Sequence, residues 1–198
     1  MLDSLLRSLS ERPSSTVVFN QYLNTHALNN LKLFLHYLLE HRHDVLLIGE
    51  APGYRGCRLT GIPFTSGSVI RASRHDIFKQ IGDRIKLPQF DKEATASVFW
   101  EFFDTDRPVP ILWNAFPFHP HLSGNPNSNR KPDRSEIEEG KRYLLLLHQI
   151  FQPRRLCSLG RVGQAILNEL FPDSEIIYVR HPSRGGKKSF IGGMAQLC

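Results

Sequence analysis

Apolar residues recur at two different spacings along the chain, and each spacing predicts a different kind of element. Between Ala27 and Glu40 the leucines lie three or four residues apart, which predicts an amphipathic helix. Four other runs are short and almost continuously apolar, as is typical of strands buried on both faces. These predicted strands are Asp44–Ile48, Val109–Phe116, Arg155–Leu159 and Glu175–Val179.

Polar residues and glycines mark the boundaries between these elements. The segment Ser123–Arg134 is rich in Asn, Pro, Ser and basic residues, which predicts a loop. Ser135, with Glu138 three residues later, matches a capping box and predicts that a helix begins at Ser135. Gly160 ends the third strand, and the apolar residues after it recur at helical spacing.

Strands that alternate with helices predict an α/β fold with a mostly parallel sheet. The 198 residues fit one domain over residues 1–198, with a helical N-terminal segment over residues 1–40. Ligands of parallel sheets bind beyond the carboxyl ends of the strands, so the strand ends are where we expect the chemistry. These ends are Gly49–Gly53, Asn114, Phe116–His119, Gly160–Arg161 and His181–Ser183.

Composition excludes several classes of protein. With 40% hydrophobic and 22% charged residues, the chain is typical of a globular protein and not of a disordered one. No uncharged apolar run reaches the roughly 18 to 20 residues that a membrane span needs. The first fifteen residues carry charges among their leucines, unlike a secretory signal. We therefore expect a cytoplasmic protein that is not in a membrane.

Cysteine and histidine spacing gives no metal motif. Cys57, Cys157 and Cys198 are widely spaced and form no CxxC pair, which excludes a zinc ribbon and fits a reducing compartment. His119 and His121 have a spacing that would suit a metal, but no acidic or cysteine ligand lies near them in sequence. We predict no metal site and no cofactor.

The charge balance permits a nucleic-acid ligand without requiring one. Lys and Arg number 25 against 19 Asp and Glu, for a net charge of +6 and a pI near 9.4. No acidic residue follows Ile176, yet Arg180, Arg184, Lys187 and Lys188 are clustered there. This cluster is either a solvated basic tail or a rim that faces phosphates.

The turn after the first strand, Gly49–Gly53 (GEAPG), has two glycines around a proline. Such a turn lets backbone N–H groups approach a ligand closely. It lacks the GxGxxG spacing and the Walker lysine, so neither a dinucleotide nor a nucleoside triphosphate is expected. Glu50 inside the turn is either a surface residue or a carboxylate that orients a water or stabilises a developing cation.

Four other residues have chemistry that suits a flat polar ligand. Phe64 follows a proline and is either a core aromatic or a stacking platform for a base. Asn114 either holds a loop or reads a pyrimidine edge through one donor and one acceptor. His181 can donate a hydrogen bond to a carbonyl oxygen that gains charge, and Ser183 can hold a phosphate.

In their order along the chain, these motifs resemble the uracil-DNA glycosylase superfamily, over about Val45 to Ser189. The motifs are GEAPG (Gly49–Gly53), GIPF (Gly61–Phe64), Asn114, SLGR (Ser158–Arg161) and HPS (His181–Ser183). GEAPG with a later GxPF is particularly similar to the thermostable branch called family 4. The resemblance implies a three-layer α/β/α sandwich around a four-stranded parallel sheet. It also implies base flipping and hydrolysis of the N-glycosidic bond in base excision repair.

The resemblance also implies residue roles. Glu50 and His181 would be catalytic, with Glu50 near the water and His181 against the base O2. The substrate-binding residues would be Gly49, Ala51, Pro52, Gly53, Phe64 and Asn114, with Phe64 stacking on the base and Asn114 reading its edge. The DNA-binding residues would be Ser183, Arg184, Gly185, Lys187 and Lys188.

Three departures from the superfamily pattern matter. Family 4 holds an iron–sulfur cluster on four cysteines, and this chain has three cysteines without that pattern, so we expect no cluster. The aspartate position of the best-known uracil-specific branch falls on Ala51, which leaves the water activator as Glu50 or none. Arg184 stands where many relatives place an apolar wedge, and we expect it to fill the vacated base stack.

The leading hypothesis is a monomeric DNA glycosylase that acts on DNA with a deaminated base and releases free uracil. Three alternatives stay open at this point. They are a catalytically weak damage-binding module of the same fold, a glycosylase that prefers hypoxanthine or xanthine, and a small-ligand α/β protein unrelated to DNA.

Overall fold

A four-stranded parallel sheet lies at the centre of the computed structural model, which describes residues 1–41, 43–103 and 107–197. The strands are β2 (Val45–Gly49), β3 (Ile111–Asn114), β5 (Arg155–Leu159) and β6 (Ile176–Val179). Their order across the sheet is β3-β2-β5-β6, and each neighbouring pair is parallel. The four strands predicted from the apolar runs are confirmed, with ends that shift by two residues at most.

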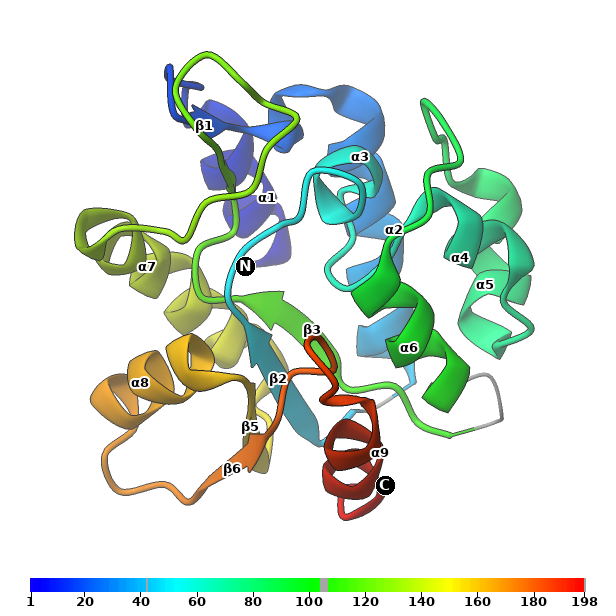
Figure 1. Cartoon of the computed structure of the whole chain (residues 1–198), viewed down its shortest axis with the longest axis vertical. Coiled ribbons are helices and arrows are strands. Elements are labelled where there is room, and N and C mark those ends of the chain that lie inside the picture. The colour runs from blue at the N-terminus through cyan, green and yellow to red at the C-terminus, as the bar shows by residue number, and fades with distance from the viewer. Residues whose placement is uncertain (42, 104–106, 198) are drawn as a thin grey trace.

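Helices cover both faces of this sheet, which explains why its strands are mostly apolar. Figure 1 shows α7 (Arg134–Phe151) and α8 (Arg161–Leu170) on one side of the sheet. On the other side lie α2 (Thr25–Glu40), α6 (Ala94–Phe103) and α9 (Lys187–Ala195). Every residue of β2 and β3 is buried between the two layers. The predicted three-layer α/β/α sandwich is confirmed.

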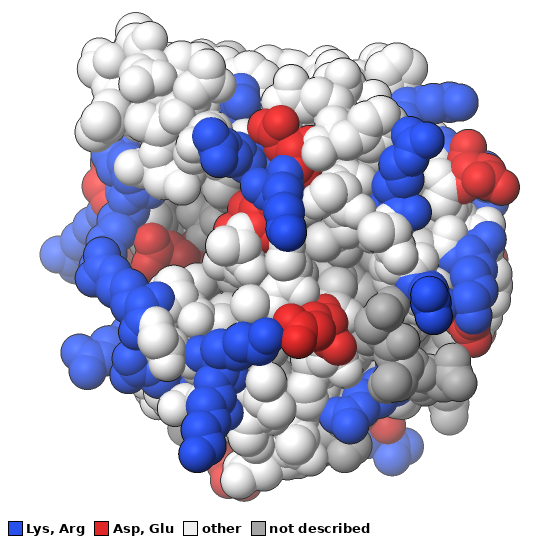
Figure 2. Space-filling model, turned by 45° about the vertical axis from the view of Figure 1, so that its right-hand side comes forward, with Lys and Arg blue, Asp and Glu red and all other residues white. Residues whose placement is uncertain are grey.

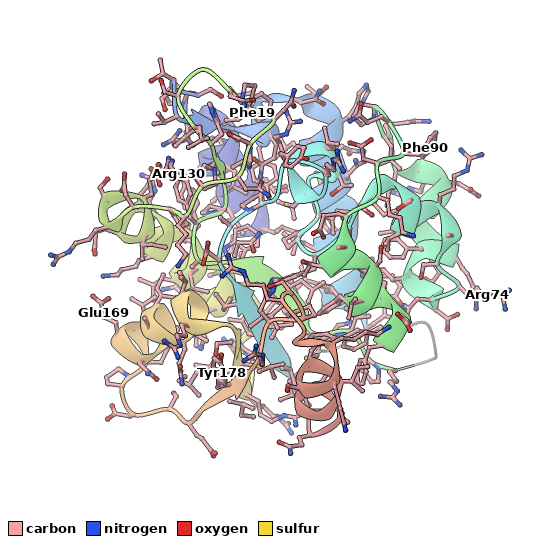
Figure 3. All side chains as sticks on the ribbon, in the orientation of Figure 1. Phe19, Arg74, Phe90, Arg130, Glu169 and Tyr178 are labelled. Atoms are coloured by element: carbon pink, nitrogen blue, oxygen red, sulfur yellow. The ribbon has the colours of Figure 1, made fainter. Side chains whose placement is uncertain are left out.

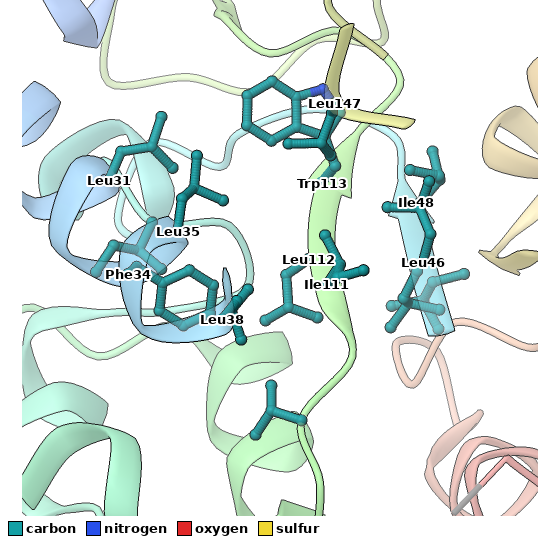
Figure 4. Close-up of a cluster of buried hydrophobic side chains, with 14 of the residues drawn as sticks. Leu31, Phe34, Leu35, Leu38, Leu46, Ile48, Ile111, Leu112, Trp113 and Leu147 are labelled. Carbon is teal, nitrogen blue, oxygen red and sulfur yellow. The ribbon is translucent and has the colours of Figure 1, made fainter. Parts of the chain in front are cut away.

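The apolar stripe of α2 packs against the β3 edge of the sheet. Figure 4 shows its buried side chains facing Ile111 and Leu112 of β3, with Trp113 above them. The helix begins where the Asn24 side chain accepts hydrogen bonds from the N–H groups of His26 and Ala27. The leucines at helical spacing therefore form the buried face of α2, and the predicted helix Ala27–Glu40 is confirmed.

Shorter elements complete the chain. They are α1 (Leu2–Glu11), β1 (Val18–Phe19), η1 (Gln21–Leu23), α3 (Cys57–Thr60), α4 (Gly67–Ala72), α5 (Asp76–Ile81), η2 (Gly82–Arg84) and β4 (His119–Pro120). The N-terminal segment contains α1, η1 and α2, and it also contributes β1, which pairs antiparallel with β4. In the described part of the chain, no helix is both long and apolar enough to cross a membrane.

A capping box begins α7, but it lies two residues earlier than the sequence predicts. The Asp133 carboxylate accepts the backbone N–H of Glu136 at 2.9 Å, and the Glu136 carboxylate accepts the N–H of Asp133 at 2.8 Å. Ser135 lies inside the first turn and donates its hydroxyl to Asp133. The predicted pair Ser135 and Glu138 is wrong because an ionised aspartate also offsets the positive end of the helix. The predicted loop therefore ends at Asp133.

The connections around the sheet open a crevice at its carboxyl edge. After β2 the chain runs to the helices on one face, and after β5 it enters α8 on the opposite face (Figure 1). Since β2 and β5 are neighbours, their outgoing loops diverge and leave space between the strand ends. Gly163 lets α8 lie directly on β2, because a Cβ there would be 2.3 Å from the Ile48 carbonyl oxygen.

Candidate active site

A cavity of about 590 Å³ lies at this carboxyl edge of the sheet. Residues from all four strand ends line it: Glu50, Ala51, Pro52 and Gly53 after β2, Asn114 in β3, Gly160 and Arg161 after β5, and His181 and Ser183 after β6. Figure 2 shows Lys and Arg side chains around a hollow in which acidic side chains are visible. Four of the five strand-end segments that the sequence singles out therefore contribute to one site, whereas Phe116–His119 does not line it.

The floor of the cavity depends on Gly49, which lies opposite Asn114 in the β2–β3 register. A Cβ at Gly49 would be 2.5 Å from Cζ of Phe64 and 2.9 Å from Oδ1 of Asn114. Asn114 is 4% exposed, and its side-chain amide has no hydrogen bond within the described residues. A buried amide ordinarily finds partners. The N–H and C=O groups of the Asn114 side chain are therefore available to bind a ligand in the cavity.

Phe64 lies beside this amide in an uncommon backbone conformation. Its φ is 56°, in the left-handed region that non-glycine residues rarely adopt. The indole N–H of Trp100 donates to its carbonyl oxygen at 2.9 Å. The Phe64 ring also stacks on Phe99, with centroids 5.3 Å apart and planes 18° apart. Helix α6 thus holds a flat aromatic surface at the cavity wall.

His181 is held by its own loop. The backbone N–H of Ser183 donates to Nδ1 of His181 at 3.2 Å, and Oγ of Ser183 lies 2.8 Å from the same nitrogen. Because Nδ1 accepts, the neutral ring carries its proton on Nε2. Burial lowers the pKa of His181, and Glu93 opposes this in part. The ring therefore offers a neutral Nε2–H donor at neutral pH.

Glu50 is half-buried at the start of the turn after β2. The Phe116 N–H donates to its backbone carbonyl at 3.1 Å, which continues the β2–β3 hydrogen bonding and fixes the residue. Burial raises the pKa of the Glu50 carboxyl, and the positive charge of Lys131 lowers it in part. The carboxylate is therefore more basic than an exposed glutamate, which suits proton transfer from water.

The loop before α7 forms a second wall that the sequence analysis did not assign to the site. Asn129, Arg130 and Lys131 line the cavity. The Asn129 Oδ1 accepts the N–H of Tyr54 at 3.0 Å, and Arg130 makes a forked pair with Glu136 at 2.7 and 2.9 Å. Figure 3 shows Arg130 between this loop and α7. The Asn-rich, basic composition of the segment was the signal that could have identified it.

Glu93 is a second cavity carboxylate that sequence reasoning missed. It caps α6 by accepting the N–H groups of Thr95 at 3.0 Å and Ala96 at 2.6 Å. The sequence signal that could have identified Glu93 is its position just before α6, where a carboxylate can cap the helix. Its negative charge favours the protonated form of His181.

The predicted DNA-binding residues divide between two places. Ser183 and Arg184 line the cavity, whereas Lys187 forms an ion pair with Glu101 at 2.8 Å. Arg184 has a φ of 51° and Gly185 a φ of 75°, so two consecutive left-handed residues turn this exposed loop sharply. Arg180 also lines the cavity, so the basic cluster after Ile176 contributes to the rim through its arginines, and Arg161 after β5 adds a further one.

The structure does not bring the histidine pair into a metal-binding group. His119 and His121 are buried, and their ring nitrogens contact backbone carbonyls. Within the described residues, no three His, Cys, Asp or Glu side chains are placed to hold a metal. Burial raises the pKa of the Cys57 thiol to about 12, so the thiol stays protonated. Cys198 lies outside the described residues.

The comparisons identify the family. The family model of the Uracil DNA glycosylase superfamily matches residues 36–189, which is well over half of the chain. The chain belongs to the uracil DNA glycosylase superfamily. The crystal structure of wild-type SMUG2 from Pedobacter heparinus is similar to it, with a TM-score of 0.70 and 14% identity over 98% of this chain and 95% of that chain. That likeness concerns the fold alone. No curated protein matches the chain.

Membership in the uracil DNA glycosylase superfamily confirms the resemblance that the motifs GEAPG, GIPF, SLGR and HPS indicate. The matched segment includes both walls of the cavity and every candidate catalytic residue. Membership in this superfamily implies that the substrate is damaged DNA.

Proposed function

We propose that the protein is a monofunctional DNA glycosylase that hydrolyses the N-glycosidic bond of uracil, or of another deaminated base, flipped out of DNA. The observation that carries this proposal is the buried Asn114 amide beside the Phe64 ring, over a strand end where only Gly49 leaves room. A pyrimidine satisfies both features, because its face stacks on an aromatic ring and its edge offers a donor beside an acceptor.

The charges in the cavity support hydrolysis. As the water oxygen bonds to C1′, the C1′–N bond breaks and its electron pair moves onto the base, so that O2 gains negative charge. The Nε2–H of His181 is the donor type that stabilises this oxygen. The Glu50 carboxylate takes the proton of the attacking water and stabilises the cationic sugar. The products are an abasic site and a base anion that takes a proton from solvent.

The cavity rim supports a DNA substrate. Arg161, Arg180, Arg184 and Lys131 border the opening and suit phosphates on either side of a flipped nucleotide. Flipping costs a few kcal/mol and least for a mispaired base, so uracil opposite guanine is the preferred substrate. The monomeric state and the cytoplasmic location remain predictions from the sequence.

A duplex oligonucleotide with one uracil tests the proposal, and a matched duplex with one hypoxanthine tests the choice of base. We expect release of uracil and an alkali-labile site with the wild type, and a large loss of release with Asn114→Ala. Asn168→Ala, on the exposed side of α8, is the matched control. Tight, salt-dependent binding without release would indicate a damage-binding module, and no binding at about 50 mM salt would contradict both hypotheses.

A further inference from the structure

His119 contacts both walls of the cavity, although it does not line the cavity itself. Its Nδ1 lies 2.7 Å from the carbonyl oxygen of Pro52, in the turn that carries Glu50. Its Nε2 lies 3.1 Å from the carbonyl oxygen of Pro126, in the loop that carries Asn129 and Lys131. The residue is 0% exposed, so water does not compete for either nitrogen.

The backbone of His119 is fixed independently of these two contacts. It lies in β4, opposite Phe19 of β1, and the N–H of His121 donates to the carbonyl oxygen of Val17 at 2.9 Å. The ring also stacks on His121, with centroids 5.7 Å apart. The imidazole is therefore held rigidly between the two walls.

We infer that His119 is a positioning residue whose Nδ1–H holds the Pro52 carbonyl and thereby sets Glu50 at the cavity. A neutral imidazole has one N–H, so it can donate to only one of two carbonyl oxygens. Nδ1 has the shorter contact, to the Pro52 oxygen, so we assign the proton to Nδ1. The contact to Pro126 becomes a hydrogen bond only when the ring gains a second proton. The inference rests on the proposed glycosylase function.

The surroundings of the ring favour its neutral form. Burial lowers the pKa of His119, the two carbonyl contacts oppose this, and the charged or titratable groups that face the ring, Arg58 of α3 and His121, lower it further. Arg58 itself joins the two walls, because its Nε donates to the Tyr54 carbonyl and its guanidinium donates to Asn127. The walls thus stay connected at neutral pH while His119 donates to Pro52 alone.

Two amide substitutions separate the two nitrogens of the ring. The side-chain nitrogen of His119→Asn can occupy the place of Nδ1, and that of His119→Gln can occupy the place of Nε2. We expect His119→Asn to keep most of kcat and His119→Gln to lose roughly tenfold, the effect of one lost hydrogen bond at the water-activating turn. KM for the oligonucleotide should change little in either. His26→Gln, at an exposed histidine in the first turn of α2, is the control.

Thermal unfolding separates positioning from general support of the fold. If both variants lose stability alike while only His119→Gln loses kcat per folded molecule, the assignment holds. Equal kcat values in the two variants, after correction for the folded fraction, would overturn it.

A measurement on the free protein decides the tautomer without any activity. Nitrogen-15 spectra of labelled histidine should show His119 as the neutral Nδ1–H tautomer at pH 7, with a midpoint below the ordinary value of about 6.5. Hydrogen exchange of residues 50–56 should rise in His119→Gln and not in His119→Asn. An Nε2–H tautomer, or equal exchange in both variants, would refute the inference. A wild type that releases no base would refute the proposed function alone.

Discussion

The indole N–H of Trp100 donates to the carbonyl oxygen of Phe64 at 2.9 Å, and this bond holds a residue whose φ is 56°. A left-handed conformation costs a non-glycine residue about 1–2 kcal/mol, which is comparable with what one hydrogen bond returns. The stacking surface of the cavity therefore depends on a donor 36 residues away in sequence.

Trp100→Phe should remove this bond while keeping an aromatic ring in the core. We expect a lower kcat/KM for base release, by roughly threefold to tenfold, together with a loss of about 1 kcal/mol in the free energy of unfolding. Trp113→Phe is the matched control, because Nε1 of Trp113 is buried without a partner in the described part of the chain. Base-release kinetics and urea unfolding check both. Equal effects on kcat/KM in the two variants would contradict the role of the bond.

Gly49→Ala should close the floor of the cavity. The added Cβ would contact Phe64 and Asn114 at distances that no relaxed side chain tolerates, so one of the two must move. We expect base release to fall by about 100-fold or more, since the added methyl removes the space for the base. Gly192→Ala, where a Cβ meets nothing within 4 Å, is the control. Binding of free uracil, measured by calorimetry, should be lost in Gly49→Ala and unchanged in the control.

The acid limb of the pH–rate profile should report Glu50. Activity needs the ionised carboxylate, so it falls as the pH drops through the raised pKa, above the ordinary value of 4.5. Lys131→Met removes the cation that lowers this pKa, and the limb should move to higher pH. Glu50→Gln should abolish the limb.

The stability of the protein should change in the matching direction. A carboxyl whose pKa is raised in the folded state favours folding below that pKa and less so as the pH rises through it. The stability of Glu50→Gln relative to wild type should therefore increase with pH in this window. For the pH–rate profile, an acid limb at the same pH in wild type and Lys131→Met would count against Glu50 as the titrating group.

Arg184→Gly tests the wedge without straining the loop. Glycine adopts the φ of 51° readily, so stability should stay the same or rise by up to about 1 kcal/mol. If the arginine fills the vacated stack, activity on duplex DNA should fall much more than activity on single-stranded DNA. Parallel assays on the two substrates measure the ratio, and an unchanged ratio would exclude the wedge role.

Asn114→Asp tests base reading. A carboxylate accepts hydrogen bonds but donates none when ionised, and it is the group that accepts from the amino group of cytosine. We expect uracil release to fall and a low rate of cytosine release to emerge. Release of neither base, with wild-type stability, would leave Asn114 essential but not a reader of the base edge.

The sheet could be predicted from the sequence because runs of apolar residues are typical of strands buried on both faces. The site residues at the strand ends could be predicted because each motif lies within a few consecutive residues. The second wall could not. Asn129 of this wall and Tyr54 are 75 residues apart, so their contact exists only after the chain has folded, and the same holds for the Lys187–Glu101 pair elsewhere, which spans 86 residues. The start of α7 was misplaced for a local reason, since two overlapping acidic patterns competed and the ionised Asp133 makes the better cap.

The order of the strands has one more consequence. β6, which ends two residues before His181, lies at the edge of the sheet and within the described residues pairs with β5 alone, and its Tyr178 is 44% exposed (Figure 3). β2, which ends just before Glu50, is paired on both sides. Edge strands open locally at lower free energy than central ones. Heating should therefore displace the histidine while the carboxylate is still in place, so that inactivation precedes unfolding.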